Sequence, residues 1–112
     1  MNIQLVETEN FPVVSMAGEI NPEDAEVLEK MVDSVVLRGG HIKIIFDLSE
    51  TSFVASNIFG VLLAVASQLS QKGGKVAIVG TSERTREILH LLSMEQYFVL
   101  FETRADALVA MK

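Results

Sequence analysis

The hydrophobic positions along the chain form short runs that alternate with segments of helical spacing. Apolar runs at residues 3–6 and 11–16, joined by the polar residues 7–10, predict the two strands of a hairpin. The run 42–48 is apolar almost throughout, as expected of a central strand that is covered on both faces. Later runs predict further strands at residues 75–79 and 97–101.

Helices are predicted between and after these strands, at residues 22–38, 57–71, 81–92 and 103–111. Asn21 suits the cap of the first helix, and Pro22 suits its first turn. The apolar stripe of this helix, which we expect to face the sheet, consists of Leu28, Met31, Val32, Val35 and Val36. Gly73 offers the left-handed turn that ends the second helix. Thr103 and Asp106 resemble a capping box for the last helix.

The resulting order is β-β-α-β-α-β-α-β-α, which predicts an α/β fold in one domain over residues 1–112. Alternation of strands and helices after a hairpin implies a mixed central sheet, whose later strands run parallel through right-handed crossovers. In such sheets the functional loops collect at the carboxyl ends of the parallel strands. The longest of these loops is predicted at residues 47–55, which makes it the first candidate for a functional site.

The composition determines the nature of the core and excludes several classes of site. Hydrophobic residues make up 49% of the 112 residues and aromatic residues only 6%, so the core is predicted to be aliphatic. The chain has no cysteine, which excludes disulfides, thiolate catalysis and zinc–thiolate sites. The net charge is −6 and the nine basic residues are scattered, which argues against nucleic-acid binding.

Neither a membrane span nor a secretion signal is predicted. The longest apolar run, residues 58–66, is shorter than the roughly 20 residues that a spanning helix needs. The first residues lack the basic start and the apolar core of a signal peptide. We therefore expect a cytoplasmic protein without direct membrane insertion. Separately, we expect either a monomer or a weak homodimer.

Ser56 is the strongest candidate for a chemical role, because it lies where the predicted loop meets the second helix. As an N-cap, its hydroxyl accepts a hydrogen bond from a backbone N–H and stabilises the helix by roughly 1 kcal/mol. As a phosphoryl acceptor, it places about −1.5 to −2 charges at the positive end of the helix dipole. Both interpretations stay open, and the residues alone favour the cap.

The other polar candidates are predicted to be structural. Thr51 and Ser52 suit turn chemistry, whereas Asp47 and Glu50 suit capping or solvation. The two histidines lie in unrelated contexts, and no nucleophile elbow or phosphate-cradling glycine loop is present. We therefore expect no catalytic residue, no metal and no cofactor, and hence no enzyme.

The second helix is apolar nearly all round at its start. Its predicted core stripe consists of Ile58, Val61, Leu62, Val65 and Leu69. Phe59, Leu63 and Ala66 fall outside this stripe. Either neighbouring elements bury this second apolar face, or the face forms an exposed docking surface for another protein. The sequence favours neither alternative.

With this order of elements, the chain resembles the STAS domain family, which includes the anti-sigma factor antagonists. Besides the leading hairpin, the resemblance is carried by short stretches at residues 46–48, 52–53, 60–63, 71–76, 88–92 and 101–107. It covers essentially the whole chain. The resemblance implies a STAS fold and a protein partner.

Family members of the antagonist type carry Asp-Ser-Ser-Gly where the loop meets the helix, and an anti-sigma factor kinase phosphorylates the first Ser. The corresponding residues here are Ala55, Ser56, Asn57 and Ile58, so the phosphoryl-acceptor Ser is kept without its neighbours. The missing acid removes a charge that would shape the approach of the kinase, and Ile58 lacks the backbone freedom of Gly. This pattern favours protein docking over a phosphorylation switch.

Three functions remain as hypotheses. In the first, the chain is an anti-sigma factor antagonist-like regulator that binds a kinase-type anti-sigma factor, a serine kinase, and is switched by phosphorylation of Ser56. In the second, it is a non-phosphorylated STAS scaffold or accessory subunit of a signalling assembly or membrane transport complex. The third is a small-molecule-binding module or enzyme. The partner-binding residues expected under the first hypothesis are Thr51, Ser52, Ala55, Ser56, Asn57, Phe59 and Leu63.

Overall fold

The elements of the computed structural model, which describes residues 2–8 and 10–112, follow the predicted order. The strands are β1 (Ile3–Glu7), β2 (Pro12–Ile20), β3 (Lys43–Val54), β4 (Lys75–Val79) and β5 (Val99–Phe101). The α-helices are α1 (Ala25–Asp33), α2 (Ser56–Gln71), α3 (Glu83–Leu91) and α4 (Arg104–Ala110). Short helical turns lie at Pro22–Asp24, Ser34–Arg38 and Glu95–Tyr97. The predicted hairpin connection includes residue 9, which lies outside the described residues.

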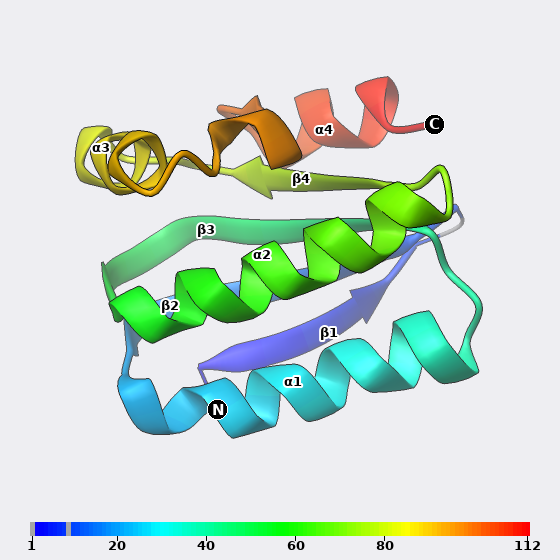
Figure 1. The fold of residues 1–112 in the computed structure, drawn as a ribbon, viewed down its shortest axis with the longest axis horizontal. Helices are drawn as coiled ribbons and strands as arrows, with labels where there is room; N and C mark the ends of the chain where they lie inside the picture. The colour runs from blue at the N-terminus through cyan, green and yellow to red at the C-terminus, as the bar shows by residue number, and fades with distance from the viewer. Residues whose placement is uncertain (1, 9) are drawn as a thin grey trace.

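The strands form one mixed sheet in the order β1-β2-β3-β4-β5 (Figure 1). β1 is antiparallel to β2, with Ile3 opposite Met16, and every other neighbouring pair is parallel. The predicted α/β fold with a mixed sheet is therefore confirmed. The parallel strands place their carboxyl ends at one edge of the sheet, which is where α2 and α3 begin.

β2 and β3 are both longer than predicted, and their extensions pair with each other. Ala17 lies opposite Glu50, and Ile20 lies opposite Val54, with register shifts on either side of Gly18. Neither extension reads as a strand alone, but each satisfies the backbone hydrogen bonds of the other. The predicted loop at residues 47–55 was therefore wrong, because most of it continues β3.

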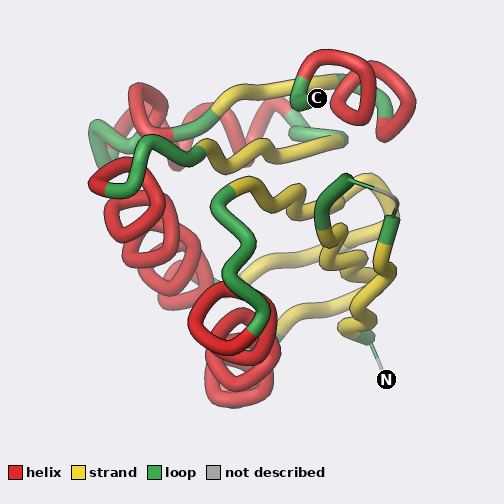
Figure 2. The backbone as a smooth tube through the Cα atoms, turned by 90° about the vertical axis from the view of Figure 1, so that its right-hand side faces the viewer, coloured by secondary structure: helices red, strands yellow, loops and turns green. Residues whose placement is uncertain are grey.

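The helices lie in two layers on opposite faces of the sheet. The larger core lies beneath α1, α2 and α3, where Leu28, Phe46 and Leu62 are fully buried. On the other face, α4 buries Ala107 against Val13 and other residues of the sheet. Figure 2 shows α4, next to the C-terminus, apart from the other helices. The start of α2 therefore lies on the face of the sheet that carries the larger core.

Side-chain caps and a glycine turn delimit the helices where the sequence predicts them. Ser82 accepts a hydrogen bond from the backbone N–H of Thr85 at 3.1 Å, and Thr103 accepts one from Asp106 at 3.1 Å. Gly73 has φ +76°, the left-handed conformation that ends α2. These three boundaries confirm the predicted ends of α2, α3 and α4.

Gly60 is an exposed residue inside α2, and apart from its chain neighbours and the backbone of the helix itself, no heavy atom lies within 4 Å of the position that a Cβ would take. Glycine in a helix interior is less stable than alanine by roughly 0.5–1 kcal/mol. We expect Gly60→Ala to raise the free energy of unfolding by this amount, as measured by urea denaturation.

Gly40 is the matched control for this substitution. It also has open space around it, but its φ is +69°. Gly40→Ala is expected to lower the free energy of unfolding by roughly 1 kcal/mol, because an alanine resists the left-handed conformation. Equal effects of the two substitutions would contradict the helical placement of Gly60.

Candidate functional site

The carboxyl end of β3 leads directly into α2, and two hydrogen bonds hold this junction to the end of β2. The backbone N–H of Ala55 donates to the carbonyl oxygen of Ile20 at 2.8 Å. The side-chain amide of Asn57 donates to the carbonyl oxygen of Pro22 at 3.0 Å. The junction is therefore fixed to the segment that connects β2 to α1.

Ser56 is the first residue of α2 and not its cap. Ala55 occupies the N-cap position with extended backbone (φ −65°, ψ 146°), and no side-chain hydrogen bond caps the helix. The prediction of a Ser56 cap was wrong by one residue, because β3 extends to Val54 and leaves Ala55 alone to turn into the helix. The exposed Ser56 hydroxyl stands at the positive end of a 16-residue helix.

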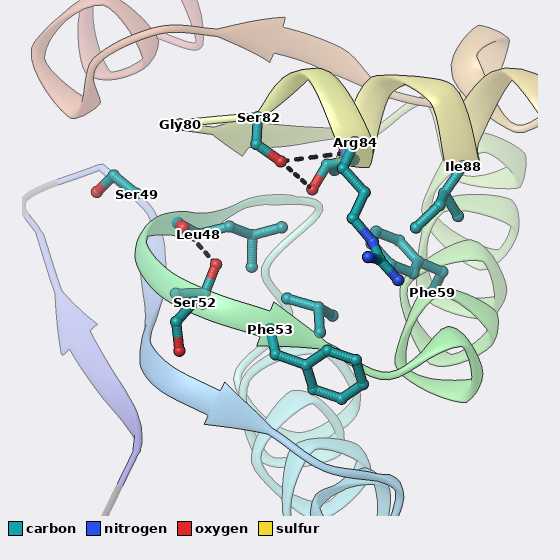
Figure 3. A pocket seen from close by; sticks show the side chains of 12 residues that line it. Leu48, Ser49, Ser52, Phe53, Phe59, Gly80, Ser82, Arg84 and Ile88 are labelled. Carbon is teal, nitrogen blue, oxygen red and sulfur yellow. Dashed lines mark hydrogen bonds between the residues drawn. The ribbon is translucent and has the colours of Figure 1, made fainter.

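The predicted partner-binding residues differ in exposure. Ser52, Ser56 and Asn57 are exposed, Thr51 and Leu63 are half-buried, and Ala55 and Phe59 are buried. Phe59 is 0% exposed, so it does not contribute to the exposed apolar face that was one alternative for α2. Leu48 and Ile88 lie on this side of the helix and line a cavity together with Phe59 (Figure 3). Burial by neighbouring elements thus explains most of the second apolar face of α2.

A cavity of about 170 Å³ lies beside the junction, between the extension of β3 and the start of α3. Its walls include the buried side chains of Leu48 and Phe59. Ser52 and Phe53 from β3 line it, and Phe53 is 41% exposed. Arg84 reaches from the first turn of α3 toward Phe59 and Phe53, whereas the Ser52 hydroxyl points away from it (Figure 3). Arg84 is the one charged side chain among the described residues that line the cavity.

Asp47 is a buried carboxylate near this site, and hydrogen bonds hold both of its oxygens. The N–H and the hydroxyl of Ser49 donate to Asp47 Oδ1 at 3.0 and 2.6 Å. Arg104 Nε, on α4, donates to Asp47 Oδ2 at 2.8 Å, and Arg104 Nη2 donates to Ser15 Oγ at 3.2 Å. The side chain of Asp47 is only 6% exposed, so the predicted solvation of Asp47 was wrong. One arginine thus ties α4 to β2 and β3.

Opposing effects set the pKa of the Asp47 carboxyl. Burial alone would raise this pKa, because it disfavours the charged form. The hydrogen bonds from Ser49 and the ion pair with Arg104 outweigh burial and hold the pKa below its ordinary value. Asp47 is therefore ionised at neutral pH and is not a proton donor.

Local sequence patterns did not identify Arg84 or Arg104 as site residues. Arg104 lies 57 positions from Asp47, so no local pattern connects the two. The positions of the two arginines in the sequence nevertheless gave an indication of their roles. Each lies in the first turn of its helix, where the dipole disfavours positive charge, and such a position indicates another partner or role.

Two kinds of feature are absent from the described part of the chain. Over residues 2–8 and 10–112, no group of three or more His, Asp and Glu side chains is placed to hold a metal ion. Over the same residues, no helix combines the length and the apolar character that crossing a membrane requires.

Comparisons with known proteins agree on one family. The model of the STAS domain matches residues 2–107. RsfB, an anti-sigma-F factor antagonist of Mycobacterium tuberculosis, is 28% identical over 112 residues, which cover 100% of this chain and 90% of RsfB. A solved anti-sigma factor antagonist from Mycobacterium paratuberculosis is 28% identical, with a TM-score of 0.82 over 97% of this chain and 92% of that one.

The anti-sigma factor antagonist SpoIIAA shares the fold at lower identity. Its unphosphorylated form is 19% identical and has a TM-score of 0.83 over 95% of this chain and 92% of that one. SpoIIAA of Bacillus in its phosphorylated form has a TM-score of 0.81 over 98% and 99% of the two chains, again at 19% identity.

Proposed function

The chain belongs to the STAS domain family, and from this premise we propose that it is an anti-sigma factor antagonist. It binds an anti-sigma factor of the serine-kinase type through residues 51–57 and the exposed side of α2. The observation that carries the proposal is the exposed Ser56 hydroxyl at the start of α2, which no capping bond occupies. The chain acts by binding and not by catalysis.

Phosphorylation of Ser56 supplies the switch. A phosphate at the first position of α2 lies near backbone N–H groups that have no partner within the helix, and the dipole favours its charge. The free chain therefore tolerates the modification. In a desolvated interface, the same charge of about −1.5 to −2 has no match and weakens binding. The common fold of SpoIIAA in both forms supports a switch that acts through charge at the surface.

A second candidate function is a STAS scaffold that is never phosphorylated. Two residues that depart from the antagonist pattern favour it, Ala55 and Ile58. Both side chains are buried, at 4% and 0% exposure, so they stabilise the junction instead of presenting groups to a kinase. Under this alternative, the same docking segment binds another subunit of a signalling or transport assembly.

Binding and phosphate transfer are tested with the purified chain and a serine-kinase anti-sigma factor encoded in the same genome. We expect a complex by isothermal titration calorimetry, and phosphate on Ser56 by mass spectrometry after addition of MgATP. Ser56→Ala should bind but accept no phosphate, whereas Ser56→Asp should bind at least about tenfold more weakly, because it mimics part of the charge.

The outcomes separate the two candidates. Binding together with a phosphate on Ser56 supports the switch. Binding without phosphate at this position supports the scaffold. A chain that binds no such kinase, while a transporter subunit or another STAS protein binds it, would contradict the antagonist function.

A further inference from the structure

We propose that the cavity beside the docking segment receives a carboxylate side chain, Asp or Glu, from the partner protein. Arg84, which lines the cavity, is the residue that binds it. The inference rests on the proposed function, because the cavity lies next to the residues 51–57 that dock the partner. It adds the chemistry of one contact, which neither the family nor the relatives' names specify.

The hydrogen-bonding groups of the cavity call for an acceptor. Three of its hydroxyl groups already donate within the chain: Ser49 Oγ to Asp47 Oδ1 at 2.6 Å, Thr51 Oγ1 to the carbonyl oxygen of Leu48 at 2.7 Å, and Ser82 Oγ to Thr85 Oγ1 at 3.1 Å. The side chain of Arg84 makes no hydrogen bond to another described residue. A guanidinium can only donate, so the ligand that pairs with it must accept.

The charge around Arg84 calls for an anion. No carboxylate of the described residues lies within ion-pair distance of this guanidinium. Glu87 lies three positions along α3, on the same face, but does not pair with Arg84, and Arg86 donates to Thr81 Oγ1 at 3.0 Å. The chain as a whole is acidic, with a net charge of −6, so Arg84 is a local exception that an acidic group would select.

The size of the cavity restricts the occupant to a single side chain. Its volume of about 170 Å³ is below the roughly 300–1,000 Å³ of sites that hold small molecules and cofactors. The apolar walls formed by Leu48 and Phe59 suit the methylene groups of an acidic side chain. Phe53, 41% exposed, offers an apolar contact for a neighbouring residue of the partner. The size of this space suits an Asp or Glu side chain.

Arg84→Gln is the decisive substitution, and Arg86→Gln is its matched control. Both change one exposed arginine on α3 to the same neutral residue, but only Arg84 lines the cavity. Binding is measured with the serine-kinase anti-sigma factor from the same genome. Arg84→Gln should weaken binding about 10- to 100-fold, because it removes a charge-assisted hydrogen bond. Arg86→Gln should leave the affinity within about twofold, and both variants should keep the wild-type denaturation midpoint.

Charge reversal identifies the group on the partner. Arg84→Glu is combined with single Lys substitutions of the Asp and Glu residues on the anti-sigma factor's surface, and one such substitution should restore binding. The inference is overturned if Arg84→Gln binds like the unsubstituted chain, if Arg84→Gln and Arg86→Gln lose affinity equally, or if no reversal restores binding. If the unsubstituted chain itself does not bind, the proposed function fails, and the inference fails with it.

Discussion

Phe59→Ala is expected to lower the free energy of unfolding by about 3–5 kcal/mol, as measured by urea denaturation. The side chain is 0% exposed and belongs to the larger core, so its removal leaves a cavity and forfeits apolar burial. An exposed docking residue would give a different result, because truncation of a surface side chain usually changes stability by less than about 0.5 kcal/mol. The substitution therefore decides between the two roles that the sequence left open for Phe59.

Leu63→Ala is the control for this experiment, because Leu63 lies one turn along α2 and is half-buried. It should lower the free energy of unfolding by roughly 1 kcal/mol, less than a fully buried leucine would. If Leu63 contacts the partner, the same variant should also bind the anti-sigma factor more weakly. A folded, stable Phe59→Ala variant that has lost binding would contradict the burial of Phe59.

Arg104→Met is expected to lower the free energy of unfolding by about 1–3 kcal/mol, because it leaves the buried Asp47 carboxylate without its ion partner, while the 37% exposure of the Arg104 side chain limits the loss. The two groups are 2.8 Å apart, and the Asp47 side chain is 6% exposed. Asp47→Asn in the Arg104→Met background should recover part of the loss, since it removes the unpaired charge. Denaturation of the single and double variants measures this coupling.

Lys30→Met provides the comparison for an exposed ion pair. Lys30 lies 3.2 Å from Glu26, and both side chains are 76% exposed. Its loss should change the free energy of unfolding by no more than about 0.5 kcal/mol. If Lys30→Met and Arg104→Met lowered the free energy of unfolding by similar amounts, the Asp47–Arg104 pair would not be effectively buried.

The depressed pKa of Asp47 also predicts an acid dependence of stability. Because this pKa is lower in the folded chain than in the unfolded one, the pair stabilises the fold above the unfolded value of about 3.9. The contribution is lost as the pH falls from there through the folded pKa. Between about pH 5 and pH 2, the free energy of unfolding should therefore fall more steeply for the wild type than for Asp47→Asn. If the free energy of unfolding fell equally with pH in the wild type and in Asp47→Asn, the lowered pKa of Asp47 would be contradicted.

Much of the fold follows from local signals in the sequence. The strands of the hairpin, the apolar run of β3 and the caps Ser82 and Thr103 each predict an element that the structure contains. These signals act over a few residues, so they are visible without tertiary structure. The STAS resemblance adds the arrangement of the elements, and the comparisons confirm it.

The features that the sequence did not reveal all depend on distant partners. The extension of β3 exists because residues 17–20 of β2 pair with it, and neither segment reads as a strand alone. This extension moves the start of α2 so that Ala55, and not Ser56, takes the N-cap position. The link from Arg104 to Asp47 and the burial of Phe59 likewise need elements that are remote in the sequence. Periodicity alone therefore places Ser56 where β3 leads into α2, but it wrongly makes Ser56 the N-cap of the helix.

The strands lie across the sheet in the same order as along the chain, from β1 to β5. Each strand therefore pairs with its immediate predecessor, and each new pairing closes a loop that holds at most one crossover helix with its connections. Each of these loops is shorter than one that would skip a strand, so it costs less entropy to close. The growing sheet can then add one strand at a time as the polypeptide is synthesised, without waiting for a later segment to insert between earlier ones. A pulse-labelled hydrogen-exchange experiment should show protection spreading outward from adjacent strands.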